Sequence, residues 1–295
     1  MEWQNTPESQ NIEDRRGMGG GIGLPIGGGG LGIGTIIILG LIGYFTGIDP
    51  RILIGGAEIL AGNSSGGQLI QGASQPSGQA ANANDPQIVF IRHVLGETEA
   101  VWADVLPAQK GVQYQNATLV LYDGATESGC GGAQAAMGPF YCPFDKKVYL
   151  DLSFFRDMET KYGGGGEFAD AYVIAHEIGH HVQDLLGILS KADQAKASMS
   201  RKDANAISVR IELMADCLAG VWANHANEKW KILDPGDVEK ALATASAIGD
   251  DRLQTAARGY VVPDSFTHGS SAQRQQWLTT GLKSGQIDSC NTFAQ

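Results

Sequence analysis

The stretch that decides the fold is residues 167–186, EFADAYVIAHEIGHHVQDLL. It is rich in good helix formers and contains no proline, and Gly187 follows it, so we predict a helix that ends there. His176 and His180 are four residues apart, which on a helix is about 40° around the axis and about 6 Å along it. Both imidazoles therefore face one point, as the nitrogen ligands of a tetrahedral zinc ion would. Glu177 projects about 100° away, where it can reach a water beside the metal without taking a ligand position.

A zinc ion in a hydrolase needs a third protein ligand, and residues 210–220, RIELMADCLAG, supply a candidate. Glu212 is the predicted third ligand, and Asp216 follows one turn later on the same helix face. A carboxylate there can accept a hydrogen bond from the second ring nitrogen of a ligating histidine and fix its orientation. The alternative for Glu212 is an ordinary salt bridge with Arg210 or a lysine.

Outward from these two helices, the chain alternates between helical and extended patterns. Asp85-Pro86 has the form of a helix N-cap followed by proline, and residues 87–106 repeat their apolar side chains at helical spacing. Strands are predicted at 117–122 and 147–152. Either strand is a candidate sheet edge with which a peptide could pair. Further helices are predicted at 202–227 and 235–258. The predicted fold class is α+β, a mainly helical, zincin-like domain with a small sheet.

The first part of the chain has a different composition. Residues 1–30 are predicted as a glycine-rich cytoplasmic segment, and residues 31–48, LGIGTIIILGLIGYFTGI, carry no charge and match the length of one transmembrane helix. Residues 49–84 are rich in Gly, Ser, Gln, Asn and Ala, which is typical of a flexible linker. The domain that carries the candidate zinc ligands is then expected at 85–295.

Two other interpretations of residues 31–48 stay open, a signal peptide and a buried core segment. The apolar run starts late and no A-x-A cleavage site follows it directly, which disfavours a signal peptide. Arg15 and Arg16 precede the run and Arg51 follows it, so the positive-inside rule favours a cytoplasmic N-terminus only weakly. We expect a single-pass membrane protein whose domain lies outside the cytoplasm.

The cysteines and the charge restrict the function classes. The four cysteines Cys130, Cys142, Cys217 and Cys290 form no CxxC pair, which disfavours a zinc ribbon or a thioredoxin-like site. They allow three disulfide connectivities, of which we favour Cys130–Cys142 with Cys217–Cys290; four buried thiols are the alternative. The formal net charge of −11 makes nucleic acid an unfavourable partner.

Several motifs together resemble a known family. They are RRGMGGG at 15–21, the apolar run, GPFYCPFDKKVYLDLSFF at 138–155, HEIGHH at 176–181, RIELMADCLAGVW at 210–222 and THGSSAQR at 267–274. The HExxH motif with a downstream ELMAD is similar to the gluzincin arrangement. The chain as a whole resembles the bacterial neutral zinc metallopeptidases that carry one N-terminal membrane span.

The resemblance implies a zinc-dependent endopeptidase that acts on peptides or proteins. It also implies a single-pass protein of the bacterial inner membrane, with a periplasmic or other extracytoplasmic domain. His176, His180 and Glu212 would be the zinc ligands and Glu177 the general base, with Asp216 as partner of His176. Similar His-then-Arg pairs late in several gluzincins make His268 and Arg274 the candidates for stabilising the oxyanion. A non-catalytic, zinc-binding envelope scaffold or adaptor is the competing hypothesis from a different class.

Overall fold

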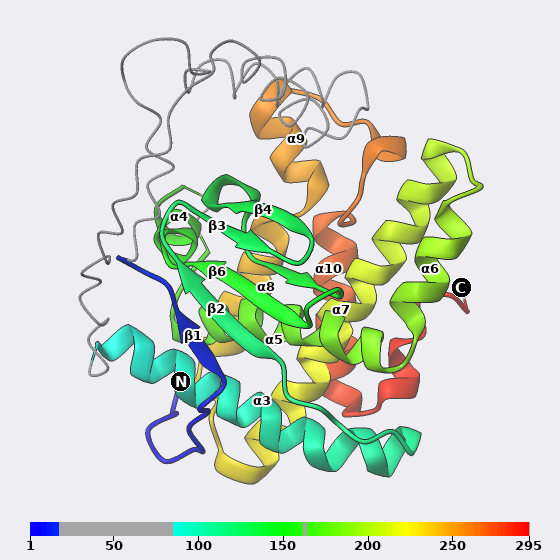
Figure 1. Ribbon diagram of the computed structural model, residues 1–295. Coiled ribbons are helices and arrows are strands. Elements are labelled where there is room, and N and C mark those ends of the chain that lie inside the picture. Colours follow the sequence, from blue (N-terminus) through cyan, green and yellow to red (C-terminus); the bar gives the residue numbers. More distant parts are fainter. Residues whose placement is uncertain (18–84, 162–163, 295) are drawn as a thin grey trace, which may run out of the picture. The chain divides into compact units, whose positions relative to one another are not determined.

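The computed structural model of the protein describes residues 1–17, 85–161 and 164–294. They form a mainly helical α+β unit with two small sheets, which confirms the mainly helical α+β part of the prediction (Figure 1). The helices and strands are, in chain order, β1 (Ile12–Asp14), α3 (Pro86–Lys110), β2 (Thr118–Tyr122), β3 (Ala125–Ser128), β4 (Gly131–Gln134), β5 (Phe140–Cys142), β6 (Lys147–Asp151), α4 (Ser153–Lys161), α5 (Glu167–Leu185), α6 (Ile188–Lys196), α7 (Arg201–Trp230), α8 (Asp237–Ala247), α9 (Asp250–Arg258) and α10 (Ser271–Ser284).

The first long helix, α3, begins where its sequence predicts. The Asp85 side chain accepts a hydrogen bond from the backbone N–H of Gln87, and Pro86 occupies the first turn. The helix ends at Gly111, which adopts a left-handed conformation with φ 67°. The helix is buried along most of its length and packs in the main hydrophobic core beneath the sheet.

The larger sheet has the strand order β1-β2-β6-β5, with β1, β2 and β6 parallel and β5 antiparallel to β6. Successive side chains alternate between its two faces, as strand geometry requires. Leu119 and Leu121 join the main core with the helices, whereas Val120 and Tyr122 pack on the opposite face. Both strands suggested by the sequence as peptide-binding edges are interior strands, so that expectation was wrong; the edges are β1 and β5.

The opposite face of the sheet is covered by the β3–β4 hairpin. Ala133 of β4 packs in the same apolar cluster as Val120 and Tyr149. A disulfide between Cys130 and Cys142 joins the turn of this hairpin to β5. The second disulfide connects Cys217 of α7 with Cys290, so both favoured pairings are confirmed.

The longest helix, α7, lies between α5 and α10 and contacts both extensively (Figure 1). Its contact with α10 depends on two glycines. A Cβ added to Gly281 would lie 1.8 Å from the carbonyl oxygen of Cys217, and one added to Gly220 would lie 2.3 Å from that of Leu278. The backbones of the two helices therefore approach more closely than any side chain would permit.

The helix predicted at 235–258 is two helices, α8 and α9. The chain changes direction at Gly249, where a Cβ would lie 2.5 Å from the backbone nitrogen of Ser271. The close passage of the segment before α10 causes this break. Because it is a tertiary contact, helical periodicity along 235–258 does not reveal it.

The sequence-based boundaries separate residues 1–30 from the domain, but contacts join Met1–Gly17 and Gln79–Gln295 in one compact unit. Within the described residues, no helix combines the length and apolar character that a bilayer crossing needs. The predicted span 31–48 and the predicted linker 49–84 lie outside the described residues.

Candidate metal centre

The three predicted metal ligands converge between α5 and α7. His176 Nε2 lies 3.2 Å from Glu212 Oε2, and His180 Nε2 lies 3.5 Å from Glu212 Oε1. One ligand atom from each of the three residues lies within 4.8 Å of the other two. Two imidazole nitrogens and a carboxylate oxygen at this spacing are the donor set of many catalytic zinc sites, so the three residues fit that ion.

The approach of α5 to α7 depends on the glycine inside the HEIGHH motif. A Cβ on Gly179 would lie 3.0 Å from the carbonyl oxygen of Ala215 and 3.2 Å from its Cα. Because Ala215 lies between Glu212 and Asp216 on α7, this close contact sets the distance from the histidines to both carboxylates. The small residue within the motif thus has a packing role that HExxH spacing alone does not explain.

Each ligating histidine is oriented through its second ring nitrogen. His176 Nδ1 lies 2.9 Å from Asp216 Oδ1, as the sequence predicts for this pair. His180 Nδ1 lies 2.9 Å from Gln183 Oε1, whose amide nitrogen in turn donates to the carbonyl of Ile211. With Nδ1 as the donor in both rings, both Nε2 atoms are available to a metal.

Asp216 is fully buried and accepts hydrogen bonds from three side chains, His176, Arg274 and Tyr172. The guanidinium of Arg274 contacts both carboxylate oxygens at 2.8 Å, and the hydroxyl of Tyr172 donates to Oδ1 at 2.6 Å. Burial raises the pKa of Asp216, but the charges of Arg274 and His176 prevail and hold it below its ordinary value. The carboxylate that orients His176 is therefore ionised and fixed.

The carboxylates also determine the charge of the site in the absence of a cation. Burial lowers the pKa of His176, but the charge of Asp216 outweighs it and raises that pKa to about 10. Burial raises the pKa of Glu177, partly opposed by the two nearby histidines. Glu212 has a pKa well below its usual range, because the charges of His180 and His268 outweigh the effect of burial. Without a metal the ring of His176 is therefore protonated at neutral pH, and a metal that binds at Nε2 must displace that proton.

His268 lies in the loop before α10, with its side chain about half exposed (51%). Its Nδ1 is 3.5 Å from Asp250 Oδ1, and the other oxygen of Asp250 accepts the backbone N–H groups of Thr267, His268 and Gly269. Asp250 therefore fixes the loop, and His268 Nδ1 lies between the hydroxyl of Thr267 at 3.0 Å and the carboxylate of Asp250. The effect of His268 on the pKa of Glu177 and Glu212 shows that its charge is felt at the centre.

Arg274 has different surroundings from those of His268. It is 4% exposed, and its guanidinium donates to Asp216, to the Tyr172 hydroxyl and to the backbone carbonyl of Ile248. Those contacts place it behind His176, where it supports the carboxylate that orients that ring.

Sequence reasoning missed three residues of the site, Tyr172, Gln183 and Asp250. Two of them carried a usable signal, since Tyr172 is one turn before His176 and Gln183 is three residues after His180 on the same helix. Asp250 carried none, because its link to His268 arises only when α9 packs beside the segment before α10.

The comparisons with known proteins agree with this geometry. A family model described as "Putative neutral zinc metallopeptidase" matches residues 1–293. The uncharacterized protein YpfJ of Escherichia coli K12 is 45% identical over 303 aligned residues, which cover 100% of this chain and 99% of YpfJ. The uncharacterized protein Rv2575 of Mycobacterium tuberculosis is 44% identical over 206 residues, 66% of this chain and 67% of that protein. No solved structure matches the chain.

Proposed function

The chain belongs to the neutral zinc metallopeptidase family, and we propose that it is a zinc-dependent peptidase that hydrolyses peptide bonds. One observation carries the proposal. His176 and His180 have their Nδ1 atoms engaged by Asp216 and Gln183, which directs both Nε2 atoms at the carboxylate of Glu212. A purely structural zinc site is usually closed by four protein ligands, whereas three ligands leave a position for reaction.

The residues around the centre have distinct chemical tasks. A bound zinc ion supplies a Lewis acid that polarises the scissile carbonyl and makes a water more acidic. The carboxylate of Glu177 takes a proton from the attacking water, and its raised pKa suits it to pass that proton to the leaving amine. The imidazole of His268, oriented by Asp250, donates a hydrogen bond to the developing oxyanion.

Arg274 has a positioning role in this proposal. Its side chain is committed to Asp216 and Tyr172, so it acts on the reaction through the orientation of His176. The sequence-based expectation grouped it with His268 as an oxyanion donor. The contacts of the two residues support separate tasks instead.

We propose a peptide or protein as substrate and a bacterial membrane as the location. The apolar run 31–48 supports attachment to a bilayer. Two disulfides support a domain outside the cytoplasm, because disulfides persist in oxidising compartments. The similar proteins come from bacteria, which supports a bacterial membrane as the site of attachment.

The proposal is tested by the zinc content and peptidase activity of the full-length protein and two variants. We expect one zinc per chain in the wild type and in Glu177→Gln, and loss of zinc in Glu212→Ala. Peptide hydrolysis should fall by roughly 10²-fold or more in Glu177→Gln, because the general base is removed while the ligands remain. A wild-type protein that is folded but binds no zinc would contradict the proposal.

The competing function, a zinc-binding scaffold without catalysis, makes a different prediction. A structural ion contributes directly to folding, so its removal should unfold the domain. If chelation leaves the protein folded and abolishes hydrolysis, the scaffold hypothesis fails. If Glu177→Gln leaves hydrolysis unchanged, the peptidase hypothesis fails.

A further inference from the structure

The residues before the apolar run 31–48 are an integral part of the domain that follows it. β1 pairs in parallel with β2 along Ile12–Leu119 to Asp14–Leu121. Before and after the ladder, the N–H of Ser9 donates to the carbonyl of Arg92, and that of Arg15 donates to the carbonyl of Leu121. Figure 1 shows this first strand lying alongside β2 at the edge of the larger sheet.

The same segment makes side-chain contacts along its whole length. Its α-amino group forms an ion pair with Asp237 at 3.1 Å, and the indole of Trp3 packs edge-on against Phe90. The carboxylate of Glu13 forms an ion pair with Lys147 at 2.7 Å. Ser9 is 1% exposed, so the segment is buried in part and is not laid loosely on the surface.

A glycine inside α3 provides independent support for this docking. Gly96 lies in the middle of the helix, where glycine costs about 1 kcal/mol relative to alanine. A Cβ at this position would lie 2.3 Å from the carbonyl oxygen of Pro7 and 2.9 Å from the backbone nitrogen of Ser9. The helix therefore has a gap in its side chains where the backbone of the N-terminal segment passes.

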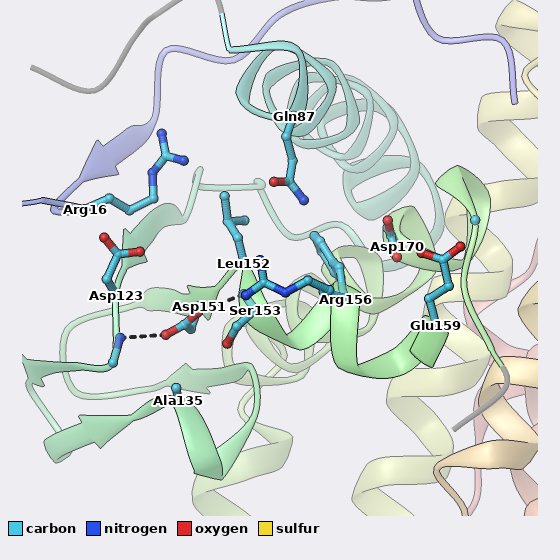
Figure 2. A pocket seen from close by; sticks show the side chains of 13 residues that line it. Arg16, Gln87, Asp123, Ala135, Asp151, Leu152, Ser153, Arg156, Glu159 and Asp170 are labelled. Atoms are coloured by element: carbon cyan, nitrogen blue, oxygen red, sulfur yellow. Dashed lines mark hydrogen bonds between the residues drawn. The ribbon is translucent and has the colours of Figure 1, made fainter. Parts of the chain in front are cut away.

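The two ends of segment 18–84 leave the domain at one place. Arg16 Nη1 lies 3.3 Å from Asp85 Oδ2, which joins the end of the N-terminal segment to the N-cap of α3. Arg16 and Gln87 line the same cavity of about 680 Å³, beside Asp123 and Arg156 (Figure 2). The chain thus departs from and returns to the same region of the domain.

We infer that residues 1–17 and the domain from residue 85 onward lie on the same side of the membrane. A chain that crosses once at residues 31–48 would put them on opposite sides, and none of the contacts above could form. A single bilayer crossing between residue 17 and residue 85 is therefore incompatible with these contacts. This replaces the single-pass topology expected from the sequence, and it does not depend on zinc binding or peptidase activity.

The test uses single cysteines in the full-length protein, one on each side of the apolar run. Asn5→Cys and Ser198→Cys change exposed residues, and the described native cysteines are all in disulfides. A membrane-impermeant maleimide is applied to spheroplasts before and after detergent permeabilisation, with the wild type as background. We expect both positions to have the same accessibility, either before permeabilisation or only after it.

Labelling of one position in intact spheroplasts and of the other only after permeabilisation would overturn the inference. Both variants should first retain the thermal unfolding midpoint of the wild type, so that accessibility reports on the folded protein. Maleimide labelling reports on which side of the membrane each cysteine lies, and it does not depend on activity. The result is therefore independent of the zinc and hydrolysis measurements. A protein without activity could still pass the test, and an active one could fail it.

A second experiment tests the docking itself. Gly96→Ala should expel the segment, and release of the N-terminal peptide by trypsin at Arg15 and Arg16 should become about tenfold faster, the effect expected of an overpacked contact. Gly132→Ala is the matched control, because a Cβ there meets nothing within 4 Å. Equal cleavage rates in the wild type and both variants would show that the contact at Gly96 does not hold the segment.

Discussion

At the scale of single residues, the candidate metal centre depends on groups outside the proposed ligand set. Gln183 is 0% exposed and spans the gap between His180 on α5 and the backbone of α7 at Ile211. The amide has one acceptor for the ring and one donor for the carbonyl, so it sets the tautomer of His180 and ties the two helices together. A carboxylate could accept from the ring but could not donate to Ile211.

Replacing this amide should weaken zinc binding without removing a ligand. In Gln183→Leu the ring of His180 loses its acceptor, and zinc affinity should fall about 10- to 100-fold, the range for partners of ligating histidines. Competition with a chromogenic chelator measures the affinity. Gln194→Leu is the control, since Gln194 is exposed on α6 and bonds only to Ser190. Equal affinities in the two variants would refute the role of Gln183.

A second residue-scale feature is Glu97, which lies in α3 beside the N-terminal segment. It is 0% exposed, and neither of its carboxyl oxygens has a hydrogen-bond partner among the described residues. Burial raises the pKa of Glu97 from 4.5 to about 8. The side chain is therefore neutral in the folded protein at pH 6 and ionised in the unfolded chain.

This difference predicts that stability falls as the pH rises. Between the unfolded pKa of 4.5 and the folded pKa of about 8, the folded state holds a proton that the unfolded state has released. The free energy of unfolding should then decrease by up to about 1.4 kcal/mol per pH unit. Glu97→Gln keeps a neutral side chain and should lose this dependence. Urea unfolding at pH 6 and pH 8 compares the two proteins, and identical slopes would contradict the prediction.

At the scale of elements, the helices are positioned by glycines at which they cross. Gly179 allows α7 to pack closely against the face of α5 that carries the two histidines. Gly220 and Gly281 allow α10 to pack closely against α7. The α10 contact matters to the site because Arg274, which holds Asp216, is carried by α10. The spacing of α5, α7 and α10 therefore affects the orientation of the His176 imidazole through Arg274 and Asp216.

Gly281→Ala should therefore reduce both stability and zinc affinity. Its Cβ would lie 1.8 Å from the carbonyl oxygen of Cys217, so the helices must separate, at a cost of about 3 kcal/mol in the free energy of unfolding. Denaturant unfolding and chelator competition measure the two effects. Gly132→Ala should change the unfolding free energy by less than about 0.5 kcal/mol. An unchanged zinc affinity in Gly281→Ala would show that α10 does not position the centre.

At the scale of the whole molecule, the domain is assembled from two parts of the chain that segment 18–84 separates. Residues 1–17 supply an edge strand, and the remainder supplies the core and the metal centre. Parallel pairing of β1 with β2 needs a long connection, and segment 18–84 provides one. The membrane topology of the chain must therefore allow both the apolar run 31–48 and the pairing of β1 with β2.

A fragment of residues 85–295, the domain expected from the sequence, should be less stable than the full chain. It lacks β1 and the ion pairs to Asp237 and Lys147, and it exposes an unpaired edge of β2. We expect a loss on the order of 3 kcal/mol, partly restored by adding a peptide of residues 1–17 but not by one of scrambled sequence. Denaturant unfolding measures the loss, and a fragment as stable as the full chain would contradict it.

The sequence by itself determined what depends on local spacing. Helical periodicity brings His176 and His180 to one face, and it puts Glu212 and Asp216 on one face of α7. The cap at Asp85 and the strand predicted at 117–122 are local as well, and both were predicted. The disulfide pairing was a choice among three possibilities that needed the folded chain to settle it.

Only the tertiary structure decided which strands are edges, where residues 1–17 belong, and what Gln183, Asp250 and Arg274 contact. Each of these depends on elements distant in sequence, and no short-range pattern encodes the partner of a three-residue strand such as β1. The composition of the chain predicted that residues 1–17 lie outside the domain, because a glycine-rich stretch follows them. Backbone hydrogen bonds to β2 and the gap at Gly96 join them to it, because pairing energy depends on geometry and not on proximity along the chain.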